Sequence, residues 1–219
     1  MESSKMIQPV QPIALNQESL VQGLDFLNKI DPDLAGTHLR LGPPPLWARE
    51  PGFPTLVHII LEQQVSLASA RAAFTKLQQA AGQITPATFL KFEPDELKRI
   101  GFSRQKAAYC RILATTILNR ELDLDSLGRL DDASARSTLI RVKGIGPWTA
   151  DIYLLMVLLR PDSWPSGDLA LAVALQELKG LPSRPSPVEL ERIASPWRPW
   201  RAVAARLLWH SYLHKRGLA

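Results

Sequence analysis

The chain has 219 residues, of which 46% are hydrophobic, and it carries a formal net charge of +5 with a pI near 9.6. This length and apolar content suit one ordinary domain or two small ones with a substantial core, and they exclude a largely disordered chain. Because 26 basic residues stand against 21 acidic ones, the charge balance permits nucleic acid binding without requiring it. The single cysteine, Cys110, excludes disulfide bonds within the chain and a four-cysteine iron–sulfur cluster, and it favours a reducing compartment.

No secretory signal and no membrane span is evident in the sequence. The N-terminus lacks the basic start and apolar stretch of a secretory signal, and the longest apolar run, Ile152–Leu159, is much shorter than a membrane span. We therefore expect an intracellular protein that does not insert into a membrane.

Apolar residues recur at helical spacing, with proline and glycine between the segments, and no strand-like alternation appears. The sequence therefore predicts an all-α protein. In chain order, the predicted helices are Gln17–Lys29, Pro54–Glu62, Leu67–Ala81, Pro86–Lys91, Asp95–Ile100, Arg104–Arg120, Asp131–Val142, Pro147–Leu159, Leu169–Leu178, Pro187–Ile193 and Trp200–Lys215.

The most informative segment is Leu139–Ala150, with the sequence LIRVKGIGPWTA. Two glycines interrupt the helical pattern, and Pro147 can begin the next helix because the missing proline N–H would be unpaired there in any case. A tight hairpin between two helices results, with basic Arg141 and Lys143 beside it. Its main-chain N–H groups, together with the helix dipole, favour binding of an anion such as a DNA phosphate. These groups belong to Gly144, Gly146, Trp148 and Thr149.

Asp168 lies eighteen residues after this segment, directly before the apolar run LALAVALQEL. Aspartate is a favoured N-cap, so the residue is predicted to cap that helix. The same helix end favours a charged carboxylate, so capping and a catalytic role are compatible. His210 and His214 share a helix face, but no third ligand or glutamate completes a zinc motif.

The hairpin string, from Lys143 to Ala150, resembles the helix-hairpin-helix motif of the DNA glycosylase (HhH-GPD) superfamily, which carries a Gly/Pro-rich loop and a downstream aspartate. Further segments are similar to signatures of its alkylated-base branch, the 3-methyladenine DNA glycosylase II type. The resemblance covers about Trp47 to the C-terminus. The similar segments are Leu56–Leu77, Gly101–Arg111 and Pro196–Trp209.

The resemblance implies two helical lobes with an active-site cleft between them. Residues 55–160 form the central lobe, which contains the helix-hairpin-helix at about 131–160. Residues 1–54 pack with residues 161–219 as the other lobe.

The resemblance also implies a function: hydrolysis of the N-glycosidic bond of alkylated bases, such as 3-methyladenine and 7-methylguanine, in duplex DNA during base excision repair. Asp168 matches the catalytic aspartate, whose charge would stabilise an oxocarbenium-like transition state. Relatives that also cleave the strand carry a lysine after the hairpin proline, where this chain has Trp148. We therefore expect no lyase activity.

The remaining site residues follow from the same resemblance. Aromatic walls would hold a cationic base by stacking, and Gln64 matches the wedge that fills the gap left by the flipped base, with Gln63 facing the pocket or adjacent backbone. Trp209 is expected in the core. The expected walls are Trp148 and Trp200, with Trp47 and Trp197 as weaker candidates.

No required cofactor is expected. The resemblance implies a sodium or potassium ion at the hairpin when DNA is bound, held by the main-chain carbonyls of Ile140, Val142 and Ile145. The expected partner is double-stranded DNA with damaged bases, bound by a monomer. The protein would act at the nucleoid in a bacterium or in the nucleus of a eukaryote.

Two other functions stay open on the sequence. One is a non-catalytic helix-hairpin-helix DNA-binding protein, which would need no carboxylate facing the phosphate site. The other is a glycosylase for uracil or oxidised purines, against which the number of tryptophans argues mildly.

Overall fold

The computed structural model describes residues 14–218, and over this range it contains twelve α-helices, two short 3-10 helices and no strand. The predicted all-α fold class is confirmed. The helices are α1 (Gln17–Ile30), α2 (Pro32–Leu41), α3 (Phe53–Glu62), α4 (Leu67–Ala81), α5 (Pro86–Leu90), α6 (Pro94–Ile100), α7 (Arg104–Leu118), α8 (Asp132–Ile140), α9 (Pro147–Met156), α10 (Leu169–Lys179), α11 (Pro187–Ala194) and α12 (Arg201–Lys215).

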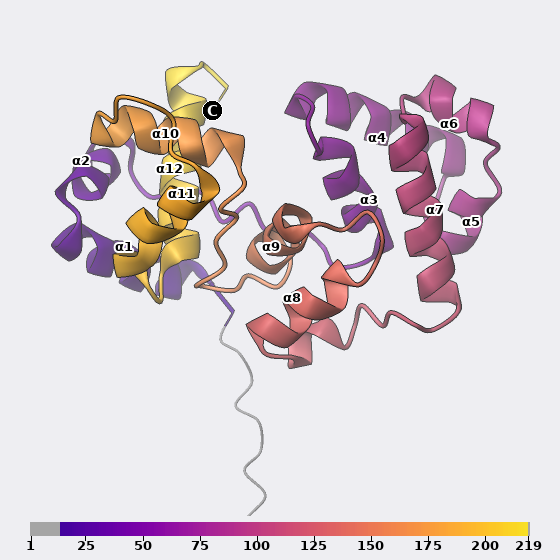
Figure 1. The fold of residues 1–219 in the computed structure, drawn as a ribbon, viewed down its shortest axis with the longest axis horizontal. Helices are drawn as coiled ribbons and strands as arrows, with labels where there is room; N and C mark the ends of the chain where they lie inside the picture. The colour runs from indigo at the N-terminus through magenta and orange to yellow at the C-terminus, as the bar shows by residue number, and fades with distance from the viewer. Residues whose placement is uncertain (1–13, 219) are drawn as a thin grey trace, which may run out of the picture.

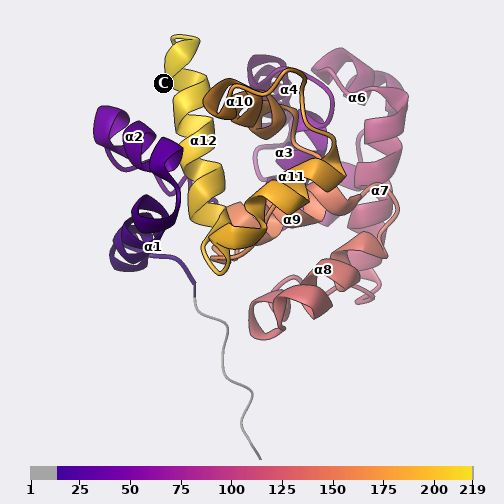
Figure 2. The same cartoon turned by 60° about the vertical axis from the view of Figure 1, so that its left-hand side comes forward.

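The helices gather into two groups that are not continuous in sequence (Figure 1). Helices α1 and α2 pack against α12, which also packs against α10, so both ends of the described chain build one group. In the other group α3 contacts α4 and α7, and α7 contacts α5 and α6. Figure 2 shows the same grouping after a rotation, with α9 lying behind α11 between the two groups.

Helix α9 is buried over most of its length, from Thr149 to Leu155. A helix that is apolar on nearly every side must be surrounded by other elements, and α9 contacts both α3 and α8. It ends at Met156, earlier than the predicted Leu159, because the Leu158 N–H bonds back to the Tyr153 carbonyl at 3.1 Å and Leu159 then adopts a left-handed φ of 53°. The chain then crosses from α9 to α10.

Helix α2 is the one α-helix of the described residues that the sequence analysis did not predict. Asp31 accepts hydrogen bonds from the main-chain N–H groups of Asp33 and Leu34, and Pro32 occupies the first helical position. These are standard helix-start signals, but only Leu34 and Thr37 of α2 are buried. The apolar stripe is therefore too narrow for periodicity to reveal the helix.

No helix among residues 14–218 combines the length and apolar character needed to cross a membrane. Cys110 is buried in α7, and burial raises the pKa of its thiol far above the ordinary value, as is usual for an unreactive structural cysteine.

Candidate active site

Asp168 caps α10, as predicted, and its carboxylate accepts three N–H hydrogen bonds. Oδ1 accepts from the main-chain N–H of Leu171 at 2.9 Å and from the indole Nε1–H of Trp209 at 3.0 Å. Oδ2 accepts from the indole Nε1–H of Trp148 at 2.9 Å. The two indoles come from α9 and α12, so three helices fix the orientation of one carboxylate. Oδ2 keeps a lone pair for a further contact.

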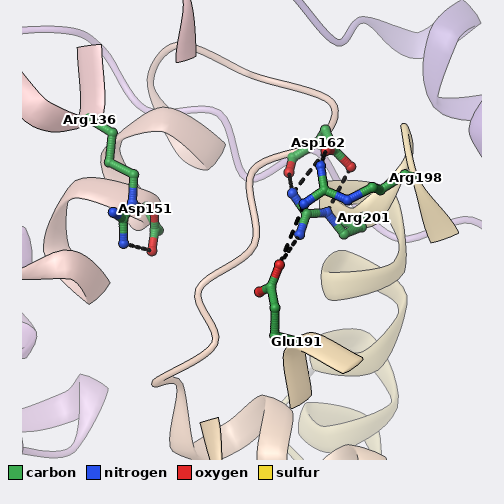
Figure 3. Close-up of polar contacts among 6 residues, drawn as sticks. All are labelled: Arg136, Asp151, Asp162, Glu191, Arg198 and Arg201. Atoms are coloured by element: carbon green, nitrogen blue, oxygen red, sulfur yellow. Dashed lines mark hydrogen bonds and ion pairs between the residues drawn. The ribbon is translucent and has the colours of Figure 1, made fainter. Parts of the chain in front are cut away.

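The connection that delivers Asp168 is held by charged side chains (Figure 3). Arg201, at the start of α12, donates to both carboxylate oxygens of Asp162 at 2.8 Å and also pairs with Glu191 of α11. Nearby, Arg136 of α8 binds Asp151 of α9 at 2.6 Å. Burial raises the pKa of Asp151, while the hydrogen bonds and charge of Arg136 oppose that rise. These pairs attach α9 to α8 just before the connection, and they attach the connection itself, at Asp162, to α12.

The hairpin between α8 and α9 contains two glycines in different environments. Gly144 has φ 102°, and a Cβ there would lie 2.3 Å from the Tyr109 ring, so the position needs glycine for both backbone and packing reasons. A Cβ on Gly146 would meet nothing within 4 Å. The open space expected for a phosphate is therefore at Gly146, whereas Gly144 serves the packing of the hairpin on α7.

Helix α9 begins with Pro147 at its first position, as predicted, and no side chain caps it. The N–H groups of Trp148 and Thr149 belong to the first turn, where a helix supplies no acceptor. Arg141 and Lys143 are exposed beside this turn. The arrangement joins free main-chain donors, the positive end of a helix dipole and two cations, which is the chemistry of an anion site.

Gln63 lies against the hairpin. Its Nε2 donates to the Gly144 carbonyl at 3.0 Å and to the Thr149 hydroxyl at 2.9 Å. Gln63 therefore contacts the hairpin, and its predicted place in the base pocket stays a prediction. Thr149 is buried, so its side chain faces Gln63 while its N–H remains part of the first turn of α9.

Gln64 follows in an exposed loop between α3 and α4. The neighbouring apolar side chains of Val65 and Leu67 are 45% and 59% exposed, which is unusual for residues of this type. An exposed loop with apolar side chains is suited to enter a base stack.

Trp47 lies beside the carboxylate site. Its ring packs edge-on against Trp209 and His210, each at a centroid distance of 6.5 Å. Trp209 is 8% exposed, as expected for a core residue, yet its indole also binds Asp168. The sequence analysis missed this second role, because nothing in the helical pattern of α12 shows which partner a buried indole reaches.

Trp197 and Trp200 lie in other parts of the fold. Trp197 is 2% exposed, donates to the Asp31 carboxylate at 2.9 Å and packs against Trp164. Trp200 lies at the start of α12 and contacts Gly23 of α1 so closely that a Cβ on that glycine would be 2.9 Å from its ring. The hydrogen-bond donors to Asp168 are the indoles of Trp148 and Trp209 and the main chain of Leu171. Trp197 is buried against other partners, and the place of Trp200 in the base pocket stays a prediction.

Several known proteins are similar in sequence to this chain at moderate identity. The chain is 27% identical over 171 residues to the alkylbase DNA glycosidase-like protein mag2 of Schizosaccharomyces pombe, covering 75% of this chain and 80% of that protein. It is 27% identical over 169 residues to a DNA-3-methyladenine glycosylase of Bacillus subtilis, covering 72% of this chain but only 56% of the relative.

Among solved structures, the fold is similar to that of the Schizosaccharomyces pombe 3-methyladenine DNA glycosylase Mag1 in complex with abasic DNA. The TM-score is 0.82 at 22% identity, over 89% of this chain and 97% of that one. The family model of the HhH-GPD superfamily of base excision DNA repair proteins matches residues 57–199, which include the hairpin and Asp168. The chain therefore belongs to the HhH-GPD superfamily of base excision DNA repair proteins.

Proposed function

We propose that this protein is a monofunctional DNA glycosylase that removes alkylated bases from duplex DNA by hydrolysis of the N-glycosidic bond. The observation that carries the proposal is the Asp168 carboxylate, held by the indoles of Trp148 and Trp209 at one end of α10. The names of the relatives, which are DNA-3-methyladenine glycosylases and an alkylbase glycosidase-like protein, support the same substrate class.

Asp168 would stabilise the positive charge that develops on the sugar as the glycosidic bond breaks. A carboxylate already fixed by its hydrogen bonds needs no reorganisation when this charge appears, and the free lone pair on Oδ2 can orient the attacking water. An alkylated base with a formal positive charge is a good leaving group, so the reaction needs no strong general acid.

The aromatic rings around Asp168 supply surfaces for such a base. Trp148 and Trp47 are partly exposed, whereas Trp209 is buried behind the carboxylate. A cationic ring over an indole face gains about 1 kcal/mol at a partly exposed site. We infer that Trp148 and Trp47 form the walls of the pocket and that Trp209 acts by orienting Asp168.

The hairpin would hold one DNA phosphate through the N–H groups at the start of α9, and Gln64 would fill the gap left by the flipped base. The carbonyls that would hold an alkali ion are those of Ile140, the last residue of α8, and of Val142 and Ile145 in the hairpin; the Val142 carbonyl already accepts the Ile145 N–H at 3.0 Å. When bound, this ion would add positive charge beside the phosphate. We expect a monomer that acts inside the cell, where its DNA substrate lies.

Base excision without strand cleavage is the expected chemistry. Schiff-base formation needs an amine at the sugar, and the position after Pro147 holds Trp148, whose indole is bound to Asp168. Borohydride should therefore trap no covalent complex between the protein and a damaged duplex. A robust trapped adduct would assign an amine nucleophile, with Lys143 as the first candidate to replace by alanine.

An excision assay over a panel of duplexes tests the function itself. We expect release of 3-methyladenine and 7-methylguanine, and little release of uracil or 8-oxoguanine. Excision limited to uracil or oxidised purines would replace the proposed substrate class. Tight binding with no excision of any lesion would identify a non-catalytic DNA-binding protein.

A further inference from the structure

The loop Gln63–Ser66, here called the wedge loop, joins α3 to α4. Gln64 is exposed and has φ 57°, in the left-handed region that residues with a Cβ seldom occupy. A conformation of this kind persists only where the surrounding structure holds it. The residues that precede Gln64 show how it is held.

Two anchors fix the last turn of α3. Lys106 of α7 donates from Nζ to the Leu61 carbonyl at 2.7 Å. Arg49 binds the buried Glu62 carboxylate through both of its terminal nitrogens, at 2.8 and 2.9 Å. Paired hydrogen bonds of this geometry are among the stronger ones in proteins. The helix end is therefore attached to two other parts of the fold.

The third anchor is Gln63, and it reaches the hairpin. Its amide donates to the Gly144 carbonyl and to the Thr149 hydroxyl, which lie 81 and 86 residues further along the chain. Gly144 sits inside the turn, and Thr149 lies in the first turn of α9, whose N–H groups face the expected phosphate. One side chain thus connects the residue before Gln64 to both sides of the anion site.

We propose that Gln63 is a positioning residue that couples the wedge loop to the phosphate-binding hairpin during base flipping. The inference rests on the proposed function, in which Gln64 enters the stack while the hairpin holds a phosphate. A side chain that enters a duplex needs a rigid support, and Gln63 attaches the loop to the hairpin that would hold a DNA phosphate. Its role is mechanical, without contact to the extruded base.

The test compares a lesion in a stable base pair with the same lesion in an unpaired bulge, where little flipping work remains. Gln63→Ala should slow single-turnover excision from the stable pair about tenfold and change excision from the bulge by less than about twofold, as expected for lost hydrogen bonds to a neighbour. Equal slowing on both substrates would show that Gln63 contacts the base, and no slowing on either would remove its role.

Thr149 supplies an independent variant. Thr149→Val removes the hydroxyl at nearly constant volume and should give part of the Gln63→Ala effect, whereas Thr149→Ser should restore the wild-type ratio. In a Gln63→Ala background, Thr149→Val should have no further effect. Gln79→Ala, at an exposed position of α4, is the matched control and should leave both rates unchanged. Additive effects of the two substitutions would overturn the coupling.

A readout that does not need excision separates this inference from the proposed function. A duplex containing 2-aminopurine should become brighter when the wild-type protein unstacks the probe, and Gln63→Ala should reduce that increase at saturating protein. Brightening without excision of any lesion would overturn the proposed function and still test the coupling. An equal increase with wild type and Gln63→Ala would overturn the coupling alone.

Discussion

The N-termini of α9 and α10 differ in whether a side chain caps them. Helix α9 begins at the hairpin with glycine and proline and has no side-chain cap, so its N–H groups remain free. Helix α10 is capped by Asp168, which satisfies the N–H of Leu171 with its own carboxylate. Both ends present the positive pole of a helix dipole. One leaves that pole open to an external anion, and the other fills it with an internal one.

Trp148 links the two ends. It is the second residue of α9, yet its indole donates to the Asp168 carboxylate that caps α10. A phosphate bound at the open end and a sugar placed beside the capped end would therefore belong to one rigid unit. Unpaired N–H groups in the first turn of a helix can therefore serve two purposes. Without a capping side chain they can bind an external anion such as a phosphate, and with an aspartate cap they hold a carboxylate that is available for catalysis.

The largest expected effect is at the capped end. Asp168→Asn keeps a good N-cap with an oxygen acceptor for Leu171, so the fold and DNA affinity should persist, but the charge and the second oxygen, which accepts from the Trp148 indole, are lost. Single-turnover excision should fall by about 10²–10³-fold, the usual scale for removing one electrostatic contact to a transition state. Excision near the wild-type rate would show that Asp168 is only a cap.

At the hairpin, the two glycines should respond differently to alanine. Gly144→Ala places a methyl group against Tyr109 at a positive φ and should lower the free energy of unfolding by about 2–4 kcal/mol. Gly146→Ala enters open space and should leave stability within about 1 kcal/mol of wild type. Thermal or urea unfolding measures both. Similar losses for both variants would contradict the separate environments described for these glycines.

The open end can be tested with charge. Gly146→Asp adds a like charge beside the expected phosphate, so affinity should fall about tenfold for damaged and undamaged duplexes alike, with Gly146→Ala as the uncharged control. Because much of the grip comes from main-chain donors, the salt dependence of binding should be shallower than that of a heavily basic protein. Unchanged affinity of the aspartate variant would place the DNA anchor elsewhere.

The smallest effects concern the indoles that join the two ends. Trp148→Phe and Trp209→Phe keep an aromatic ring but remove the N–H donor to Asp168, and each should slow excision about three- to tenfold. Trp200→Phe is the matched control and should leave excision unchanged, because Trp200 packs against α1. A slower reaction with the Trp200 variant alone would place that residue in the base pocket.

Local features of the site could be predicted from the sequence because they depend on neighbouring residues. Pro147 starts α9 and Asp168 caps α10, since a missing N–H and a short carboxylate act within one turn of helix. The predicted end of α8, at Val142, is wrong by two residues. The helix ends at Ile140, because the Val142 N–H bonds to the Leu139 carbonyl as the hairpin begins.

Only the tertiary structure decided which side chains from distant parts of the sequence contact one another. The sequence itself determined an all-helical protein, a tight glycine hairpin and a capping aspartate, because helical periodicity and turn chemistry are short-range. The bonds of Trp209 to Asp168 and of Gln63 to Gly144 span 41 and 81 residues, and no local pattern encodes their direction. The same limit applies to Trp200, whose packing against Gly23 depends on how α1 and α12 cross. Side-chain direction at such distances follows from helix packing, which a single sequence does not specify by periodicity alone.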